Sequence, residues 1–147
     1  ALRKDDPRLR QPSMLGHLID VRSMLKAPRY DAAAGHLART FDAANDEDAL
    51  EAAREAIHAL EALAKLVAGT PSGTFADAVK ALVRQERLHA RLGDALEKVW
   101  AFANQQPGLR HGGASAPVIE GYEATFAINV AASAMLHLLE LDSLPPA

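Results

Sequence analysis

Apolar residues recur every three or four positions along most of this 147-residue chain, which is the spacing of one face of an α-helix. The clearest stripe lies between residues 47 and 68, where charged side chains occupy the opposite side. Weaker stripes predict further helices over about 14–25, 30–44, 74–83 and 88–103. No segment alternates apolar and polar residues as a half-buried strand does. The pattern predicts an all-α protein, an up-and-down bundle of five to six helices.

The last predicted helix, at about 119–141, is apolar on more than one side. Such a helix is buried either at the centre of a bundle or in a subunit interface, and the sequence leaves both placements open. The excess of apolar surface predicts a homodimer, in which the same face of two copies is covered. The large apolar residues of this helix are Tyr122, Phe126, Ile128, Val130, Met135, Leu136, Leu138 and Leu139.

Capping residues separate these helices. Ser13 can accept a hydrogen bond from the first turn of the first helix, and Asn45 or Asp46 can do the same for the third. Thr74 followed by Asp77 resembles a capping box at the start of the fourth helix. The predicted organisation is an arm or linker over 1–12, a helical bundle over 13–142 and a tail over 143–147.

The composition excludes several classes of protein. Half of the residues are apolar (49%), aromatic residues are scarce (5%), and alanine favours helices that approach one another closely. Residues 1–40 carry eight basic and four acidic side chains, whereas residues 41–147 carry eight basic and 15 acidic ones, so the net charge is -3. This balance argues against binding nucleic acid through bulk positive charge, and the basic N-terminal segment is interpreted as a solvated arm.

The expected location is cytoplasmic. The chain has no cysteine, no apolar segment of the roughly 20 residues that cross a bilayer, and no signal peptide at its start. These features predict no disulfide, no thiolate zinc site and no membrane partner. The absence of an initiator Met also indicates a segment of a longer protein, with a fused or partner effector domain.

Sequence motifs predict no cofactor and no metal. The chain has no H-E-x-x-H motif of a zinc protease. It also has no pair of carboxylate-rich helices with the Glu-x-x-His spacing of a di-iron bundle. The segment GTPSG lacks the lysine and strand of a phosphate-binding loop, and no G-x-S-x-G nucleophile motif occurs. The six histidines are His17, His36, His58, His89, His111 and His137.

The strongest candidate for chemistry is the segment QQPGLRHGG, which places Arg110 beside His111 between proline and glycine residues. Glycine allows sharp turns and a close approach of the backbone to a ligand. Arginine binds phosphate through a fixed fork of donors, and histidine exchanges protons near neutral pH. The pair is therefore a candidate phosphodiester site. The alternative is structural, with the arginine capping a helix and the histidine filling a hydrogen-bonding niche.

Three segments together make the chain similar to a known family. They are DEDALEAAREAIHALEALAKLVAGTPSGTFADAVKAL, then LHARLGDALEKVWAFANQQPGLRHGG, and finally YEATFAINVAASAMLHLLE. In this order they resemble the abortive-infection type of HEPN domain, with a Glu-Ala-Leu-x-Lys stretch, a Thr-Phe helix start, a Gly-Leu-Arg-His-Gly motif and an alanine-rich closing helix. The resemblance covers roughly residues 45–141 and extends more weakly over 13–44.

The resemblance implies a HEPN-like bundle that forms a homodimer in a prokaryotic defence system. Active members of the wider group are metal-independent endoribonucleases that bring Arg and His motifs together at a dimer cleft. On this basis Arg110 and His111 match the catalytic motif. Glu61 and Lys65 match its polar helix face and are expected to support the site.

The spacing of the motif leaves a second function open. Active members separate the arginine from the histidine by several residues, whereas Arg110 and His111 are adjacent. The alternative is a non-catalytic module that dimerises, or that binds RNA or a nucleotide for a larger effector. Other Arg and His residues do have the longer spacing, but a chain with 11 arginines and six histidines contains such pairs by chance. These pairs are Arg10/His17, Arg29/His36 and Arg84/His89.

Overall fold

The computed structural model describes residues 12–104 and 121–144, and in these ranges all regular structure is helical. This confirms the predicted all-α class, and the helix bounds agree with the predicted ones to about two residues. The elements in chain order are α1 (Pro12–Met24), a short 3-10 helix η2 (Pro28–Tyr30), α2 (Asp31–Asn45), α3 (Ala49–Ala68), α4 (Phe75–Arg84), α5 (Ala90–Ala103) and α6 (Gly121–Ser143).

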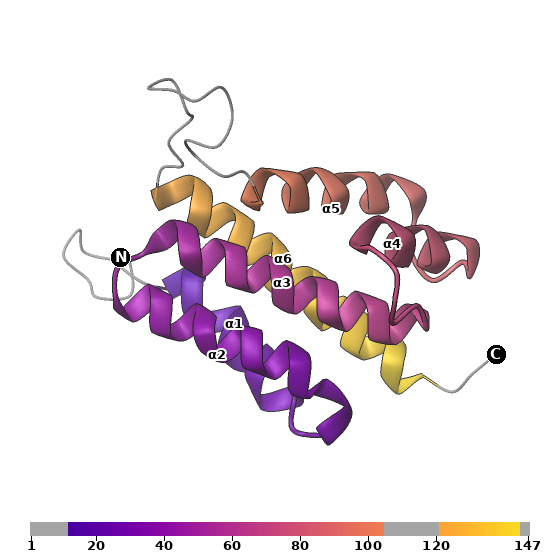
Figure 1. The fold of residues 1–147 in the computed structure, drawn as a ribbon, viewed down its shortest axis with the longest axis horizontal. Coiled ribbons are helices and arrows are strands. Elements are labelled where there is room, and N and C mark those ends of the chain that lie inside the picture. Colours follow the sequence, from indigo (N-terminus) through magenta and orange to yellow (C-terminus); the bar gives the residue numbers. More distant parts are fainter. Residues whose placement is uncertain (1–11, 105–120, 145–147) are drawn as a thin grey trace, which may run out of the picture.

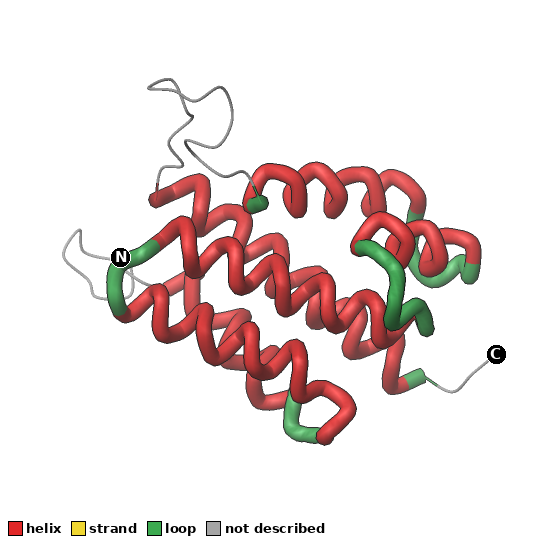
Figure 2. Tube along the Cα trace, viewed as in Figure 1, coloured by secondary structure: helices red, strands yellow, loops and turns green. Residues whose placement is uncertain are grey.

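Helix α3 is the centre of the bundle. It packs against α2 and α6 along most of its length and also meets α4 and α5, while α1 lies against α6. Helices α1, α3 and α6 run in one direction and α2 and α5 in the other, with the short α4 lying across the end of α3 (Figure 1). Short turns join the helices within 12–104 (Figure 2).

Alanine lets the neighbouring helices approach α3 closely. Ten residues of this helix are buried, and six of them are alanines. A small side chain at the contact shortens the distance between helix axes, so two or more neighbours can pack around one central helix. The predicted apolar stripe of α3 is correspondingly buried at Ala53, Ile57, Leu60, Ala64 and Val67.

The cap of α3 differs from the sequence prediction. Asn45 is the last residue of α2 and Asp46 follows it, so neither residue caps α3. The side chain of Asp48 does so instead, accepting a hydrogen bond of 3.1 Å from the backbone N–H of Glu51. The reason is the turn between the helices, where Glu47 adopts a left-handed conformation (φ 58°) and moves the start of α3 to Ala49.

The capping box of α4 is confirmed. The backbone N–H of Asp77 donates to Oγ1 of Thr74 (3.1 Å), and the backbone N–H of Thr74 donates to the Asp77 carboxylate (2.9 Å). Hydrogen bonding from Thr74, above all from its backbone N–H, lowers the pKa of the Asp77 carboxyl group. The box fixes the start of α4 directly after the turn that follows α3.

Helix α6 takes the first of the two placements that its sequence left open, burial inside the bundle, on one of its faces. Its inward face is buried against α3 and α1, with Ile128 and Met135 inaccessible to solvent. In contrast, Tyr122 and Phe126 are 76% and 64% exposed on its outer face. The helix therefore has a core face and a second apolar face that the described part of this chain does not cover.

The same helix has the length and composition of a membrane span. Its most apolar stretch of 18 residues carries at most two charged side chains, and 44% of that stretch is buried inside the bundle. Since the core helix of a bundle has the same properties, this feature does not assign a membrane location. The cytoplasmic location stays a prediction.

Candidate functional site

The predicted site residues fall into two groups. Arg110 and His111 lie outside the described residues, whereas Glu61 and Lys65 are both half-buried on α3. Within 12–104 and 121–144, no ion pair joins Glu61 to Lys65, although their spacing would allow one. The structure therefore places Glu61 and Lys65, which are expected to support the site, on the central helix.

Glu61 and Lys65 belong to a longer row of polar side chains, which we call the α3 polar face. Its members are Arg54, His58, Glu61 and Lys65, and each is partly buried. Steps of four, three and four residues keep them on one side of the helix. The sequence indicated that these residues lie opposite the apolar stripe, but none of them is fully exposed, because α3 is surrounded by other helices.

The end of α5 meets the α3 polar face at His58. Nε2 of this histidine lies 3.2 Å from Oδ1 of Asn104, the residue that follows α5. The amide of Asn104 is itself held, since its Nδ2 donates to the backbone oxygen of Trp100 (2.9 Å). Asn104 directly precedes the QQPGLRHGG segment in the sequence. The α3 polar face therefore contacts the last described residue before the candidate motif.

On the α2 side, His58 is part of a further polar group that we call the His-Glu-His cluster: His36 of α2 with Glu55 and His58 of α3. One donor atom from each of the three lies within 4.8 Å of the others, and all three side chains are partly buried. Nδ1 of His36 is 2.7 Å from Oε2 of Glu55. The two imidazole rings meet edge to face at 5.5 Å.

Arg39 lies beside this cluster. Its Nε donates to Oε2 of Glu55 (3.3 Å), and its Nη2 is 3.0 Å from Nδ1 of His36. Burial by itself would raise the pKa of Glu55, but hydrogen bonds from His36 and Arg39 outweigh it and hold the pKa below its usual value. Glu55 is therefore a carboxylate at neutral pH, next to two histidines and one arginine.

The cluster was missed in the sequence because its members come from two helices. The sequence contains one hint of the cluster, a Glu-x-x-His motif formed by Glu55 and His58. Its three-residue spacing places both side chains on one face of α3. A second such step, from Glu86 to His89, crosses the turn between α4 and α5. Neither step predicts that His36 lies opposite, because that proximity depends on how α2 packs against α3.

In two of the longer-spaced Arg/His pairs, one member has a structural role. The side chain of His89 caps α5 by accepting a hydrogen bond from the backbone N–H of Arg91 (3.1 Å). Arg29 forms an ion pair with Asp142 at 2.7 Å. These contacts explain His89 and Arg29 without a catalytic role. Arg10 lies outside the described residues.

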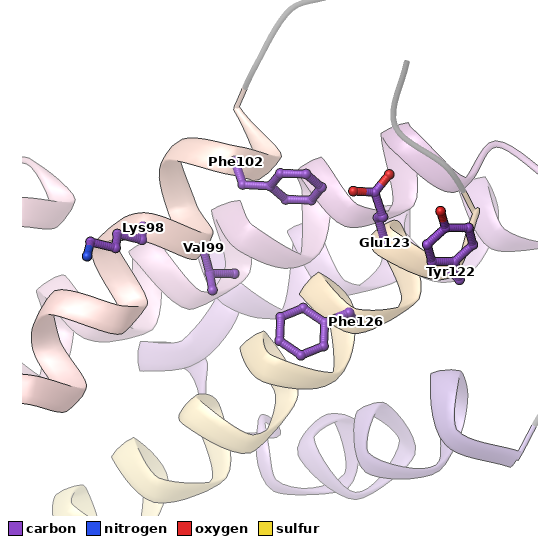
Figure 3. Close-up of a pocket in the computed structure, with 6 residues that line it drawn as sticks. All are labelled: Lys98, Val99, Phe102, Tyr122, Glu123 and Phe126. Atoms are coloured by element: carbon purple, nitrogen blue, oxygen red, sulfur yellow. The ribbon is translucent and has the colours of Figure 1, made fainter. Parts of the chain in front are cut away.

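An apolar hollow lies between α5 and α6, next to the ends that flank residues 105–120. Val99 and Phe102 extend into it from α5, and Tyr122 and Phe126 line it from α6 (Figure 3). Its volume is about 570 Å³. A second hollow of about 420 Å³ shares Phe126 and continues along both helices to Leu92, which is 56% exposed. We call the two hollows together the α5–α6 groove.

Comparisons with protein family models, with curated proteins and with solved structures found no match to this chain. The roles of these residues therefore have to be argued from their own geometry and chemistry.

Proposed function

We propose that this chain is a HEPN-like domain of a prokaryotic defence system, which cleaves RNA without a metal ion at a homodimer cleft. The all-helical bundle and the ordered sequence motifs support this proposal. The observation that carries it is the contact between His58 and Asn104. Through this contact the α3 polar face, which includes Glu61 and Lys65, adjoins Asn104. This residue directly precedes the QQPGLRHGG segment that contains Arg110 and His111.

The proposed reaction is an internal transfer at the phosphodiester. The 2'-hydroxyl of the ribose attacks the adjacent phosphorus, a new bond from O2' to phosphorus forms, and the bond to the 5'-oxygen of the next nucleotide breaks. His111 accepts the hydroxyl proton, and a proton reaches the leaving oxygen from the paired motif or from water. Arg110 holds the charged phosphate oxygens through its fork of donors. The products are a cyclic phosphate and a free 5'-hydroxyl end.

The α5–α6 groove supports the dimer. It exposes Tyr122 and Phe126 near the helix ends that flank residues 105–120, and Leu92 farther along α5. A second copy covering this groove would bring two motifs to one cleft, as a two-fold axis requires.

RNA cleavage in the absence of metal tests the proposed function. Purified protein is incubated with structured RNA in EDTA, beside Arg110→Ala and His111→Ala variants and an Arg91→Ala control. Arg91 is exposed in the first turn of α5, so its replacement changes the net charge as Arg110→Ala does. We expect wild-type and control protein to cleave and both motif variants to lose at least about 100-fold in rate, the lower range for removing a proton-transfer group.

Cleavage that persists in both motif variants would contradict the assigned site. Glu61→Gln and Lys65→Met test the supporting residues, and a smaller loss of rate is expected there because these side chains act through others. The ends of the product distinguish the mechanism, since internal transfer leaves a cyclic phosphate.

The alternative is a non-catalytic HEPN-like module that dimerises or binds RNA or a nucleotide. The adjacency of Arg110 and His111 favours it, because two adjacent residues cannot place their side chains as a longer spacing does. Intact RNA at high protein concentration, with binding that Arg110→Ala abolishes, would support this module over the enzyme.

A further inference from the structure

We propose that the His-Glu-His cluster binds a divalent first-row transition-metal ion, with His36, Glu55 and His58 as its three protein ligands. None of these ligands belongs to the QQPGLRHGG segment, and the metal site is proposed independently of RNA cleavage. It joins α2 to α3 through the ion.

The donor set matches the chemistry of such ions. Two imidazole nitrogens and one carboxylate oxygen suit zinc, cobalt, nickel or iron, whereas magnesium and calcium prefer oxygen ligands alone. The three donor atoms already lie within 4.8 Å of one another. Ligands of a tetrahedral ion at about 2.0–2.1 Å lie roughly 3.3 Å apart, so the set comes together through small rotations of the three side chains.

The hydrogen bonds in the cluster leave His36 with conflicting demands. Its Nδ1 faces the Glu55 carboxylate at 2.7 Å, which requires a donor, and the Arg39 guanidinium at 3.0 Å, which requires an acceptor. One nitrogen cannot meet both demands. A metal ion removes the conflict, since the unprotonated Nδ1 and the carboxylate oxygen then bind the same cation.

Arg39 occupies the place of the cation when no metal is bound. Its guanidinium reaches both Glu55 and His36, yet its side chain is 55% exposed, whereas that of Glu55 is only 14% exposed. An exposed arginine can turn towards solvent and leave the ligands free. Arg39 is therefore a competitor of the metal rather than a ligand.

Charge around the cluster favours a cation. A hollow of about 250 Å³ extends from Glu55 and Arg39 towards the turn between α2 and α3. Several carboxylates lining one cavity create a negative potential that concentrates cations next to the ligands. The remaining lining residues are Asp42, Ala43, Asp46, Asp48 and Glu51.

Asn104 supports one ligand from outside. Its Oδ1 lies 3.2 Å from Nε2 of His58 and is itself oriented by the bond from its Nδ2 to the Trp100 carbonyl. Groups that fix the rings of metal-bound histidines in this way commonly raise metal affinity 10- to 100-fold. The end of α5 thus helps to hold the site.

Zinc binding by calorimetry tests the proposal. The metal-free chain, without an affinity tag, is titrated with ZnCl₂ at pH 7.5. We expect one site per chain and no comparable binding of MgCl₂. His36→Gln, Glu55→Gln and His58→Gln should each weaken zinc binding by more than about 100-fold, and Asn104→Ala by roughly 10- to 100-fold.

Arg39→Gln gives the opposite expectation. Removing a positive charge within hydrogen-bond distance of two ligands should tighten zinc binding by about tenfold or more. Because the Arg39 side chain is exposed, this variant tests the site even if a ligand variant unfolds. His17→Gln and His137→Gln replace exposed histidines outside the cluster and should leave zinc binding unchanged.

Cobalt provides an independent readout, because the absorption of bound Co²⁺ reports its coordination geometry. Zinc binding that is unchanged when His36 and His58 are both replaced would overturn the proposal, as would weaker binding by Arg39→Gln. RNA cleavage plays no part in either result, so failure of the metal site is distinguishable from failure of the proposed function.

Discussion

At the scale of single residues, Tyr30 ties the end of α6 to the start of α2. Its hydroxyl donates to the carboxylate of Asp142, which also pairs with Arg29 at 2.7 Å. The hydrogen bond to Asp142 raises the pKa of Tyr30, and burial and the negative charge of Asp142 act in the same direction. These side chains, far apart in the sequence, close the bundle at that end.

The raised pKa of Tyr30 predicts a loss of stability at alkaline pH. A group whose pKa is higher in the folded state contributes stability below its unfolded pKa of about 10, and this is lost as the pH rises through the folded value. We expect Tyr30→Phe to lower the free energy of unfolding by about 1 kcal/mol at pH 8. The difference from wild type should shrink above pH 10, measured by urea unfolding. A difference that stays constant across this range would contradict the assignment.

At the scale of helices, the contact between α4 and α5 depends on Gly93. A Cβ atom at this position would lie 2.8 Å from Cγ1 of Val79 and 3.4 Å from Cγ2 of Val83. Valine is stiff and cannot easily move its methyl groups away. The absence of a side chain at Gly93 therefore sets how closely α5 approaches α4.

Replacing Gly93 by alanine should destabilise the protein although alanine is the better helix former. Overpacking costs about 1–3 kcal/mol, and improved helix propensity returns up to about 1 kcal/mol, so we expect a net loss. Gly35→Ala on α2 is the matched control, because its nearest non-neighbouring atom is in the flexible Arg39 side chain at 3.7 Å. The control should be stabilised by up to about 1 kcal/mol in thermal unfolding.

Val79→Ala tests the cause of this loss. If the two side chains collide, the double variant Gly93→Ala/Val79→Ala loses less stability than the two single changes added together. If the two losses of stability simply add, the contact of 2.8 Å between the new Cβ and Val79 is not the cause of the destabilisation.

At the scale of the whole molecule, most of the surface of α5 is not buried by the other described helices. Apart from Gly93 and Ala103, its residues are at most partly buried. The α5–α6 groove therefore exposes large apolar side chains, which in soluble proteins commonly mark an interaction surface. Under the proposed function, a second copy of the chain covers this groove.

This proposal predicts that Phe126→Glu separates the dimer. A charge in an apolar interface is left without solvent or a partner, so association should weaken without loss of the helical bundle. We expect light scattering to give twice the 15.7 kDa chain mass for wild type and the single chain mass for the variant. Met24→Glu, at a 44% exposed position on α1, is the control and should remain dimeric. A wild-type monomer at micromolar concentration would contradict the dimer.

The helices could be predicted because local spacing decides them. The apolar stripe of α3 and the Thr74–Asp77 capping box needed only neighbouring residues in the chain. The cap at Asp48 was not predicted, since Asn45, Asp46 and Asp48 can all accept the same kind of hydrogen bond. Only the left-handed conformation of Glu47 distinguishes among them.

For the candidate sites, the sequence determined the residue types available and their positions along each helix. It placed Glu61 and Lys65 on a polar face of α3 and identified the Arg110–His111 motif. Only the tertiary structure decided that His36 lies opposite Glu55 and His58 and that Asn104 reaches His58. Helical periodicity is a short-range property, whereas these contacts depend on which helices pack together and at what rotation. The buried alanines of α3 allow several such packings, and the whole core selects one.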